Sequence, residues 1–116
     1  LEGVDAGLHL LLAVGQQRAV EMARALAAEP QLLLLDEPAA GLNIYETAEV
    51  ARLICTIRDM GITVLLVEHD MSLVMDISDE IVVLSFGAKL AEDTPPHIQK
   101  NEEVIKIYLG EDDALA

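Results

Sequence analysis

Two short apolar runs each end in residues whose side chains can bind metal ions or transfer protons. Leu32–Leu35 is followed directly by Asp36 and Glu37, and Ile62–Val67 is followed by His69 after one intervening residue. In open parallel α/β sheets, the carboxyl ends of neighbouring strands meet at one edge, and ligands bind there. If both runs are parallel strands, the three polar side chains share that edge and form one candidate site.

These three side chains suit the hydrolysis of a nucleotide. Asp36, placed directly after four apolar residues, is suited to holding Mg²⁺, usually through water. Glu37 could orient or deprotonate an attacking water molecule, and His69 could contact a phosphoryl group during its transfer. Each residue alone is a weak signal, because many strands end in Asp and most lone histidines lie in loops. The order and spacing of the set favour the catalytic interpretation.

The elements that must position these residues alternate between helix and strand. Predicted helices run from Gly15 to Pro30 and over Tyr45–Met60, Met71–Ile77, a short polar segment from Thr94, and Val104–Leu109. Predicted strands cover Leu32–Leu35, Ile62–Val67, Glu80–Ser85 and a short antiparallel Ala88–Ala91. The alternation predicts an α/β domain with a mainly parallel sheet. The two continuous apolar runs predict strands that are buried on both faces.

Composition narrows the possible functions of the 116-residue chain. Lys and Arg number 7 against 21 Asp and Glu, and the formal net charge of -14 repels nucleic-acid phosphates and anionic lipids. Aromatic residues are only 3%, which argues against base stacking. Cys55 is the only cysteine, so an internal disulfide is excluded. No apolar run approaches the roughly 20 residues that span a bilayer. We expect a soluble intracellular chain that does not bind nucleic acid and reaches a membrane only through a partner.

Four segments together resemble the motifs of ATP-binding cassette (ABC) transporter ATPases. Leu12–Arg18 followed by Ala23–Leu26 resembles the ABC signature and its helix, and Leu32–Pro38 resembles the Walker B strand with its catalytic glutamate. Ala39–Asn43 stands where that family has its D-loop, and Glu68–Asp70 where it has the switch histidine. The resemblance covers nearly the whole chain after the first dozen residues, and the motifs are jointly very specific.

Two local features resemble one branch of that family, the ATPases of branched-chain amino acid importers. The first is the D-loop sequence with Asn43 together with the separate segment Glu68–Met71. The second is the C-terminal segment from Thr94 to Gly110. The related ATPase of lipopolysaccharide export is the nearest rival, because its tail is similar, although its D-loop and switch region usually read differently. The resemblance divides the chain into residues 1–93, part of the ATPase core, and residues 94–116, a C-terminal helical extension.

The resemblance implies ATP and Mg²⁺ as cofactors and gives a role to each candidate residue. Asp36 would bind the metal, and Glu37 and His69 would be catalytic. Nucleotide contacts fall on four signature and D-loop residues: Gly15, Gln16, Gly41 and Asn43. The serine and first glycine of the commonest signature are replaced by Ala13 and Val14, which removes one hydrogen bond to phosphate, worth roughly 1.5–3 kcal/mol. Relatives vary here, so we expect the change to be tolerated.

The partners that the resemblance implies are also specific. ABC ATPases work as head-to-tail pairs, in which the amino end of the signature helix faces the γ-phosphate held by the other subunit. The pair drives membrane permease subunits and, through them, acts with a substrate-binding protein. We therefore expect a peripheral protein at the cytoplasmic face of the cell membrane.

One motif of the family is absent from these 116 residues: there is no G-x-x-x-x-G-K-[ST] phosphate-binding loop. The resemblance therefore predicts a partial P-loop NTPase fold that lacks the P-loop strand between Ile62–Val67 and Glu80–Ser85. Those strands pair directly, another chain fills the gap, or the sheet is open there. We expect a fragment of a longer gene product or a marginal domain, and weak or no ATP binding by the chain alone.

Three functional hypotheses follow. The first is the C-terminal portion of a transport ATPase, active once an N-terminal half is present. The second is a degenerate, non-enzymatic module that only pairs with a complete ATPase subunit. The third, a stand-alone metal-dependent hydrolase, is weakest because Asp36, Glu37 and His69 do not complete a metal cage.

Overall fold

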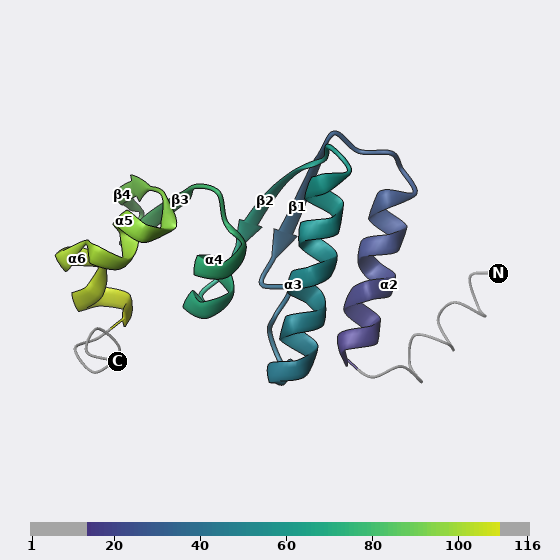
Figure 1. Cartoon of the computed structure of the whole chain (residues 1–116), viewed down its shortest axis with the longest axis horizontal. Helices are drawn as coiled ribbons and strands as arrows, with labels where there is room; N and C mark the ends of the chain where they lie inside the picture. Colours follow the sequence, from purple (N-terminus) through teal and green to yellow (C-terminus); the bar gives the residue numbers. More distant parts are fainter. Residues whose placement is uncertain (1–13, 110–116) are drawn as a thin grey trace. The chain divides into compact units, whose positions relative to one another are not determined.

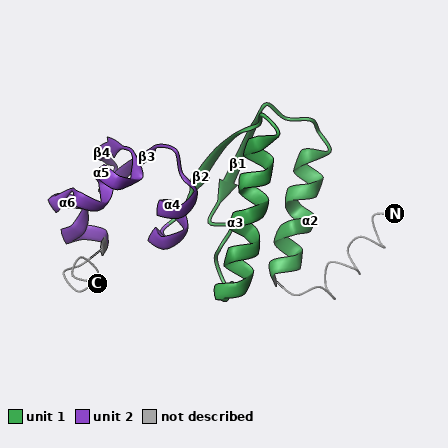
Figure 2. Cartoon of the chain, viewed as in Figure 1, with its two compact units in different colours: residues 1–68 green, residues 69–116 purple. Residues whose placement is uncertain are grey.

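The computed structural model describes residues 14–109, which belong to two compact units, residues 1–68 and 69–116 (Figure 2). The first unit contains α2 (Val14–Leu26), β1 (Leu32–Asp36), α3 (Ile44–Asp59) and β2 (Thr63–Val67). The second contains α4 (Met71–Ile77), β3 (Ile81–Ser85), β4 (Ala88–Asp93), α5 (Pro95–Lys100), α6 (Glu102–Val104) and the π-helical turn η1 (Ile105–Leu109), labelled in part in Figure 1. The expected elements are all present, with ends that differ by a few residues at most. Leu12, Ala13 and Gly110, which carry part of the motif argument, lie outside the described residues.

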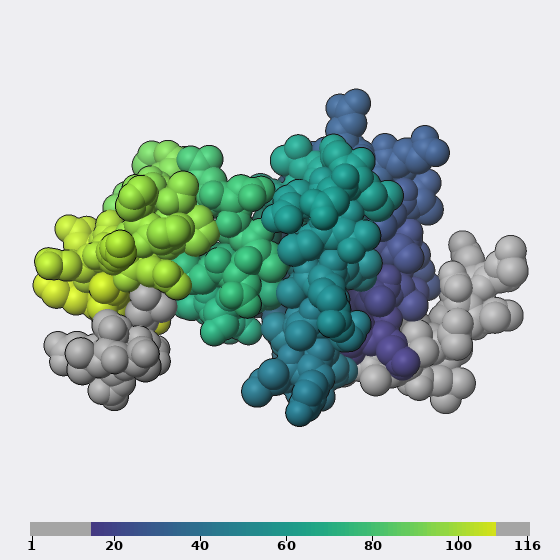
Figure 3. Space-filling model, viewed as in Figure 1, coloured from purple at the N-terminus to yellow at the C-terminus, as the bar shows by residue number. Residues whose placement is uncertain are grey.

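The first unit is built on a parallel pair of strands. β1 and β2 run in register from Leu32 opposite Thr63 to Asp36 opposite Val67. Helices α2 and α3 lie side by side on one side of this pair (Figure 1), and Figure 3 shows α3 filling the near surface of the unit. The buried core of the unit lies under these helices and is aliphatic: Met22, Leu33, Ala39, Val50, Ile54 and Ile57. A parallel β–α–β arrangement therefore holds the carboxyl ends of both strands at one edge.

The opposite face of this two-stranded sheet is exposed. Leu34 and Leu65, paired across the strands, are 64% and 56% exposed, and Leu32 and Val67 are similarly open. Exposure alternates along both strands because successive side chains point to opposite faces. The prediction that both strands are buried on both faces is therefore wrong for the described residues. Both helices of the unit pack on the same face, and no described element of the unit covers the other.

The second unit is built on an antiparallel hairpin. β3 and β4 are joined by Phe86 and Gly87, which both have positive φ angles, as a two-residue hairpin turn requires. Its core packs one face of the hairpin against the C-terminal helices and consists of Ile81, Val83, Ile98 and Val104. The hydroxyl of Tyr108 in η1 donates a hydrogen bond to the carbonyl of Leu84. The C-terminal turns thus fold onto the hairpin.

The strand pairings concern the gap that is expected between β2 and β3 where the P-loop strand is missing. Within residues 14–109, β2 pairs with β1 in the first unit, and β3 pairs with β4 in the second. β2 and β3 belong to different units, so which of the three outcomes holds at the expected gap stays a prediction. The α/β class is confirmed, but the described residues form two small sheets in place of one mainly parallel sheet. Within the same residues, no helix is both long enough and apolar enough to cross a membrane.

Candidate functional site

Asp36 and Glu37 lie where β1 ends. Asp36 is the last residue of the strand, opposite Val67, and is exposed. The backbone N–H of Glu37 donates to the carbonyl of Val67 at 2.7 Å, so the ladder continues one residue past the strand. Glu37 then has φ of 48°, a left-handed conformation that is uncommon for residues other than glycine. Such strain costs on the order of 1–3 kcal/mol and is concentrated at functional sites.

A second carboxylate holds the turn that follows Glu37. Glu68 Oε2 accepts a hydrogen bond from the backbone N–H of Ala39 at 3.1 Å, which joins the end of β2 to the expected D-loop. Inside the turn, the N–H of Ala40 donates to the carbonyl of Glu37 at 3.1 Å. Gly41 has φ of 77°, and a Cβ there would meet nothing within 4 Å, so the glycine is needed for its backbone conformation. The turn after Glu37 is thus fixed from both ends.

The amino end of the signature helix also contacts this region. The N–H of Gly15 in the first turn of α2 donates to Glu46 Oε2 at 3.1 Å. One turn later, Arg18 Nη2 donates to the carbonyl of Ala40 at 3.4 Å. Gln16, between these contacts, is exposed. Helix α2 is therefore attached to both the D-loop and α3.

Asn43, a predicted nucleotide contact, caps α3. Its Oδ1 accepts the N–H of Glu46 at 2.8 Å, and Glu46 Oε1 accepts the N–H of Asn43 at 3.2 Å. This reciprocal pair is a capping box, which satisfies two backbone donors at the helix start. The side chain of Asn43 therefore has a structural partner, and its contact with nucleotide stays a prediction.

His69 is the first residue of the second unit and is exposed, two positions after the end of β2. The next residue, Asp70, caps α4 by accepting the N–H of Leu73 at 3.1 Å. His69 is therefore confined between a strand end and a helix cap. Because it belongs to the other unit, its distance from Glu37 stays a prediction.

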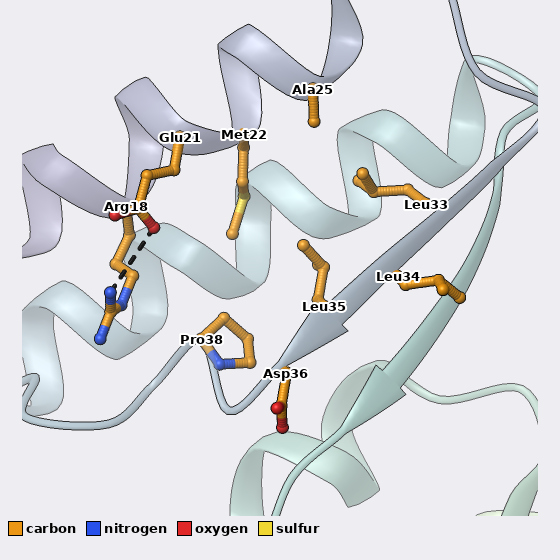
Figure 4. Close-up of a pocket in the computed structure, with 9 residues that line it drawn as sticks. All are labelled: Arg18, Glu21, Met22, Ala25, Leu33, Leu34, Leu35, Asp36 and Pro38. Carbon is orange, nitrogen blue, oxygen red and sulfur yellow. Dashed lines mark ion pairs between the residues drawn. The ribbon is translucent and has the colours of Figure 1, made fainter.

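A shallow pocket of about 250 Å³ lies between α2 and β1 (Figure 4). It is lined by Arg18, Glu21, Met22, Ala25, Leu33, Leu34, Leu35, Asp36 and Pro38. Figure 4 shows Met22 and Ala25 above the strand, with Asp36 at the end of the strand beside Pro38 and an ion pair between Arg18 and Glu21, whose atoms are 3.5 Å apart. Much of the lining is apolar, so this pocket is poorly suited to phosphate, which needs several N–H donors.

The donor set at the end of β1 fits one kind of metal. Among residues 14–109, no three His, Cys, Asp or Glu side chains form a group that could hold an ion. Mg²⁺ is usually bound by one or two carboxylates, with water and substrate phosphates completing its shell. The exposed carboxylate of Asp36 therefore fits Mg²⁺ that arrives with a nucleotide.

Sequence reasoning missed two residues of this region. Glu46 has no role among the sequence predictions, although its position three residues after Asn43 is the capping-box spacing that could have revealed it. Glu68 was seen as part of the switch motif, but its bond to Ala39 spans 29 positions and has no local signal. Both are carboxylates that bind backbone N–H groups.

Comparison with known proteins agrees with the motifs and the fold. Residues 5–40 match the family described as ABC transporter, and residues 88–114 match the family described as branched-chain amino acid ATP-binding cassette transporter. The solved structure of MJ1267, an ATP-binding cassette of an ABC transporter, superimposes with a TM-score of 0.78 at 29% identity. That match covers 88% of this chain and 42% of the other. The chain belongs to the ABC transporter ATPases.

Within the family, relatives of the chain include proteins of branched-chain amino acid transport. It is 56% identical over 101 residues to the high-affinity branched-chain amino acid transport ATP-binding protein BraF of Pseudomonas aeruginosa, and 52% identical to LivG of Escherichia coli. The lipopolysaccharide export ATP-binding protein LptB of Escherichia coli is 40% identical over the same length. The chain spans 40% of the length of BraF and of LivG.

Proposed function

We propose that this chain is the C-terminal part of an ATP-hydrolysing subunit that energises branched-chain amino acid import. The observation that carries the proposal is the 56% identity to BraF over 101 residues. The position of Asp36 and Glu37 at the end of a strand with a parallel neighbour supports it, because ligands bind at such an edge.

The proposed roles of the chain's residues follow from their places. Asp36 would hold Mg²⁺, which offsets negative charge on the phosphates when it is bound. Glu37 would orient the attacking water and accept its proton, and His69 would contact the phosphoryl group. The strained backbone of Glu37 and its anchored N–H support this role, because they fix the direction in which the carboxylate leaves the strand.

The proposed partners are a second ATPase subunit in a head-to-tail pair and membrane permease subunits, with a substrate-binding protein acting indirectly. The amino end of α2, with Gly15 and Gln16, would face the nucleotide held by the second subunit, and so would the D-loop with Gly41 and Asn43. We also propose that the protein is peripheral and lies at the cytoplasmic face of the cell membrane. The net charge of -14 supports attachment through protein partners, since such a charge disfavours direct binding to anionic lipid.

The test is ATP hydrolysis by a fusion of this chain to an upstream segment of BraF that supplies a phosphate-binding loop, since the chain spans 40% of the length of BraF. Replacing the general base with its amide isostere, Glu37→Gln, should lower kcat by about a hundredfold or more. Glu49→Gln is the matched control, because Glu49 is exposed on α3 and pairs with Arg52. Unchanged turnover in Glu37→Gln would remove Glu37 from the catalytic role.

One alternative is a non-enzymatic module that pairs with a complete ATPase subunit. Titration of the 116-residue chain with Mg-ATP separates the two, since micromolar affinity is incompatible with a chain that only pairs. A lipopolysaccharide-export role is the other alternative, and the 40% identity to LptB supports it less than the 56% identity to BraF supports import.

A further inference from the structure

The carboxylate of Glu46 joins two segments that the proposed function places against the same partner. Its Oε2 accepts the N–H of Gly15 at 3.1 Å, and its Oε1 accepts the N–H of Asn43 at 3.2 Å. Gly15 lies 31 positions before Glu46, whereas Asn43 is the cap of its own helix. One side chain therefore connects the first turn of the signature helix with the last residue of the D-loop.

The fit between Gly15 and Glu46 is close. A Cβ built at Gly15 would lie 2.8 Å from Glu46 Oε2 and 3.2 Å from both Glu46 Cβ and Cγ. The first of these distances is too short for any side chain, so an alanine there would push the carboxylate away. Glycine at position 15 thus lets the Glu46 carboxylate approach this N–H group without being displaced.

Electrostatics favour this arrangement. Gly15 lies in the first turn of α2, and Asn43 caps the first turn of α3, so both N–H groups are at helix amino ends. The helix dipole makes such ends favourable places for a carboxylate, and hydrogen bonds to a charged group are stronger than neutral ones. Glu46 is half-buried and its bond to Gly15 is partly buried, which limits the screening of that bond by water, whereas its bond to Asn43 is exposed.

We propose that Glu46 is a positioning residue that fixes the signature helix relative to the D-loop, so that both meet the second subunit as one surface. The expected effect on the second subunit rests on the proposed function, but the contact of Glu46 with Gly15 and Asn43 does not. A second tie runs beside it, from Arg18 Nη2 to the carbonyl of Ala40 at 3.4 Å. Because the Glu46 carboxylate bonds to the backbone N–H groups of Gly15 and Asn43, we assign it to the presentation of these segments and not to the chemical step.

The contact is tested first on the 116-residue chain by amide hydrogen exchange and two-dimensional NMR. Glu46→Ala should lower protection of the Gly15 and Asn43 amides by about threefold to tenfold, the effect of losing one hydrogen bond each. Glu46→Gln keeps one carbonyl oxygen and should retain one of the two bonds. Glu49→Gln, on the same helix, should change neither amide. Unaltered Gly15 and Asn43 amides in Glu46→Ala would overturn the proposed contact.

Gly15→Ala provides a second variant that does not remove the carboxylate. It should shift the Asn43 amide in the wild-type background, because the displaced Glu46 side chain is shared by both bonds. In the Glu46→Ala background the same substitution should have no effect on Asn43. Equal effects in both backgrounds would contradict coupling through Glu46. Circular dichroism of each variant checks that the fold is retained.

The consequence is tested on the BraF fusion. Glu46→Gln should raise the KM for ATP by about threefold to tenfold and leave kcat within about twofold, because it disturbs presentation and not chemistry. A lower KM in this variant would overturn the proposal, since it would mean that the carboxylate obstructs the nucleotide. A fusion without any ATP hydrolysis would instead count against the proposed function, and the amide measurements would still decide the contact.

Discussion

Glu68 holds the turn after the candidate catalytic carboxylate, so replacing it should loosen that turn measurably. Its Oε2 accepts the N–H of Ala39 at 3.1 Å in a half-buried setting, and Ala39 is only 8% exposed. A hydrogen bond to a charged group contributes about 1.5–3 kcal/mol, and a buried donor left without a partner has a similar cost. Glu68→Ala should therefore lower the free energy of unfolding by about 1.5–3 kcal/mol. Glu68→Gln, which keeps an acceptor oxygen, should lose about half as much.

Urea unfolding of the 116-residue chain, followed by circular dichroism, measures these losses. The matched control is Glu49→Ala, because Glu49 and its partner Arg52 are each 70% exposed. Exposed pairs contribute about 0–1 kcal/mol, so the control should be nearly neutral. If Glu68→Ala were no more destabilising than Glu49→Ala, the bond to Ala39 would not hold the turn, and the reasoning about Glu68 would be refuted.

Two further predictions concern the exposed sheet face and the second unit. Leu34→Thr with Leu65→Thr should reduce self-association in sedimentation velocity at little cost in stability, because both leucines are more than half exposed; unchanged association would contradict this. The bond from the Thr94 N–H to Asp93 Oδ1, at 2.8 Å, is the largest cause that lowers the pKa of Asp93 below its ordinary value of 3.8. A carboxyl whose pKa is lowered by folding stabilises the fold at pH values above its ordinary pKa, and this contribution is lost as the pH falls through the lowered pKa. Asp93→Asn should therefore weaken the fall in stability below about pH 4. The same loss of stability at acid pH in both proteins, measured by urea unfolding, would contradict this.

Local patterns predicted most of the elements. Met71–Ile77 has the predicted bounds, and the strands and the long helix differ from their predictions by one or two residues. These segments are defined by apolar periodicity and by stop signals such as Gly61, whose positive φ ends α3 as expected of a C-terminal glycine. The motif letters also placed Asp36 and Glu37 correctly at the end of a strand with a parallel neighbour.

Burial was less predictable than secondary structure. The run of four leucines in β1 reads as buried on both faces, but Leu32 and Leu34 are more than half exposed. The apolar composition of a strand shows that both of its faces can be buried. Whether they are buried depends on the elements that cover them. Within the first unit both described helices lie on one face, and the sequence gives no sign of this.

The carboxylates that support the site needed a structure. Glu46 could be recognised as a capping-box residue, but nothing local indicates that its second oxygen reaches Gly15, 31 positions earlier. The positive φ of Glu37 is likewise set by the anchoring of the turn on both sides. Contacts between segments that are distant in sequence decide these features, and the local conformational propensities of the residues do not predict such contacts.

The proposed function requires that Asp36 bind the metal and that His69 reach the same nucleotide. Mn²⁺ replaces Mg²⁺ in oxygen-ligand sites and broadens the NMR signals of nearby nuclei. Added with ATP to the BraF fusion, it should broaden the amide signals of Asp36, Glu37 and His69, and Asp36→Asn should abolish the effect at substoichiometric metal. Sharp signals at Asp36 and His69, with ATP bound, would contradict the account.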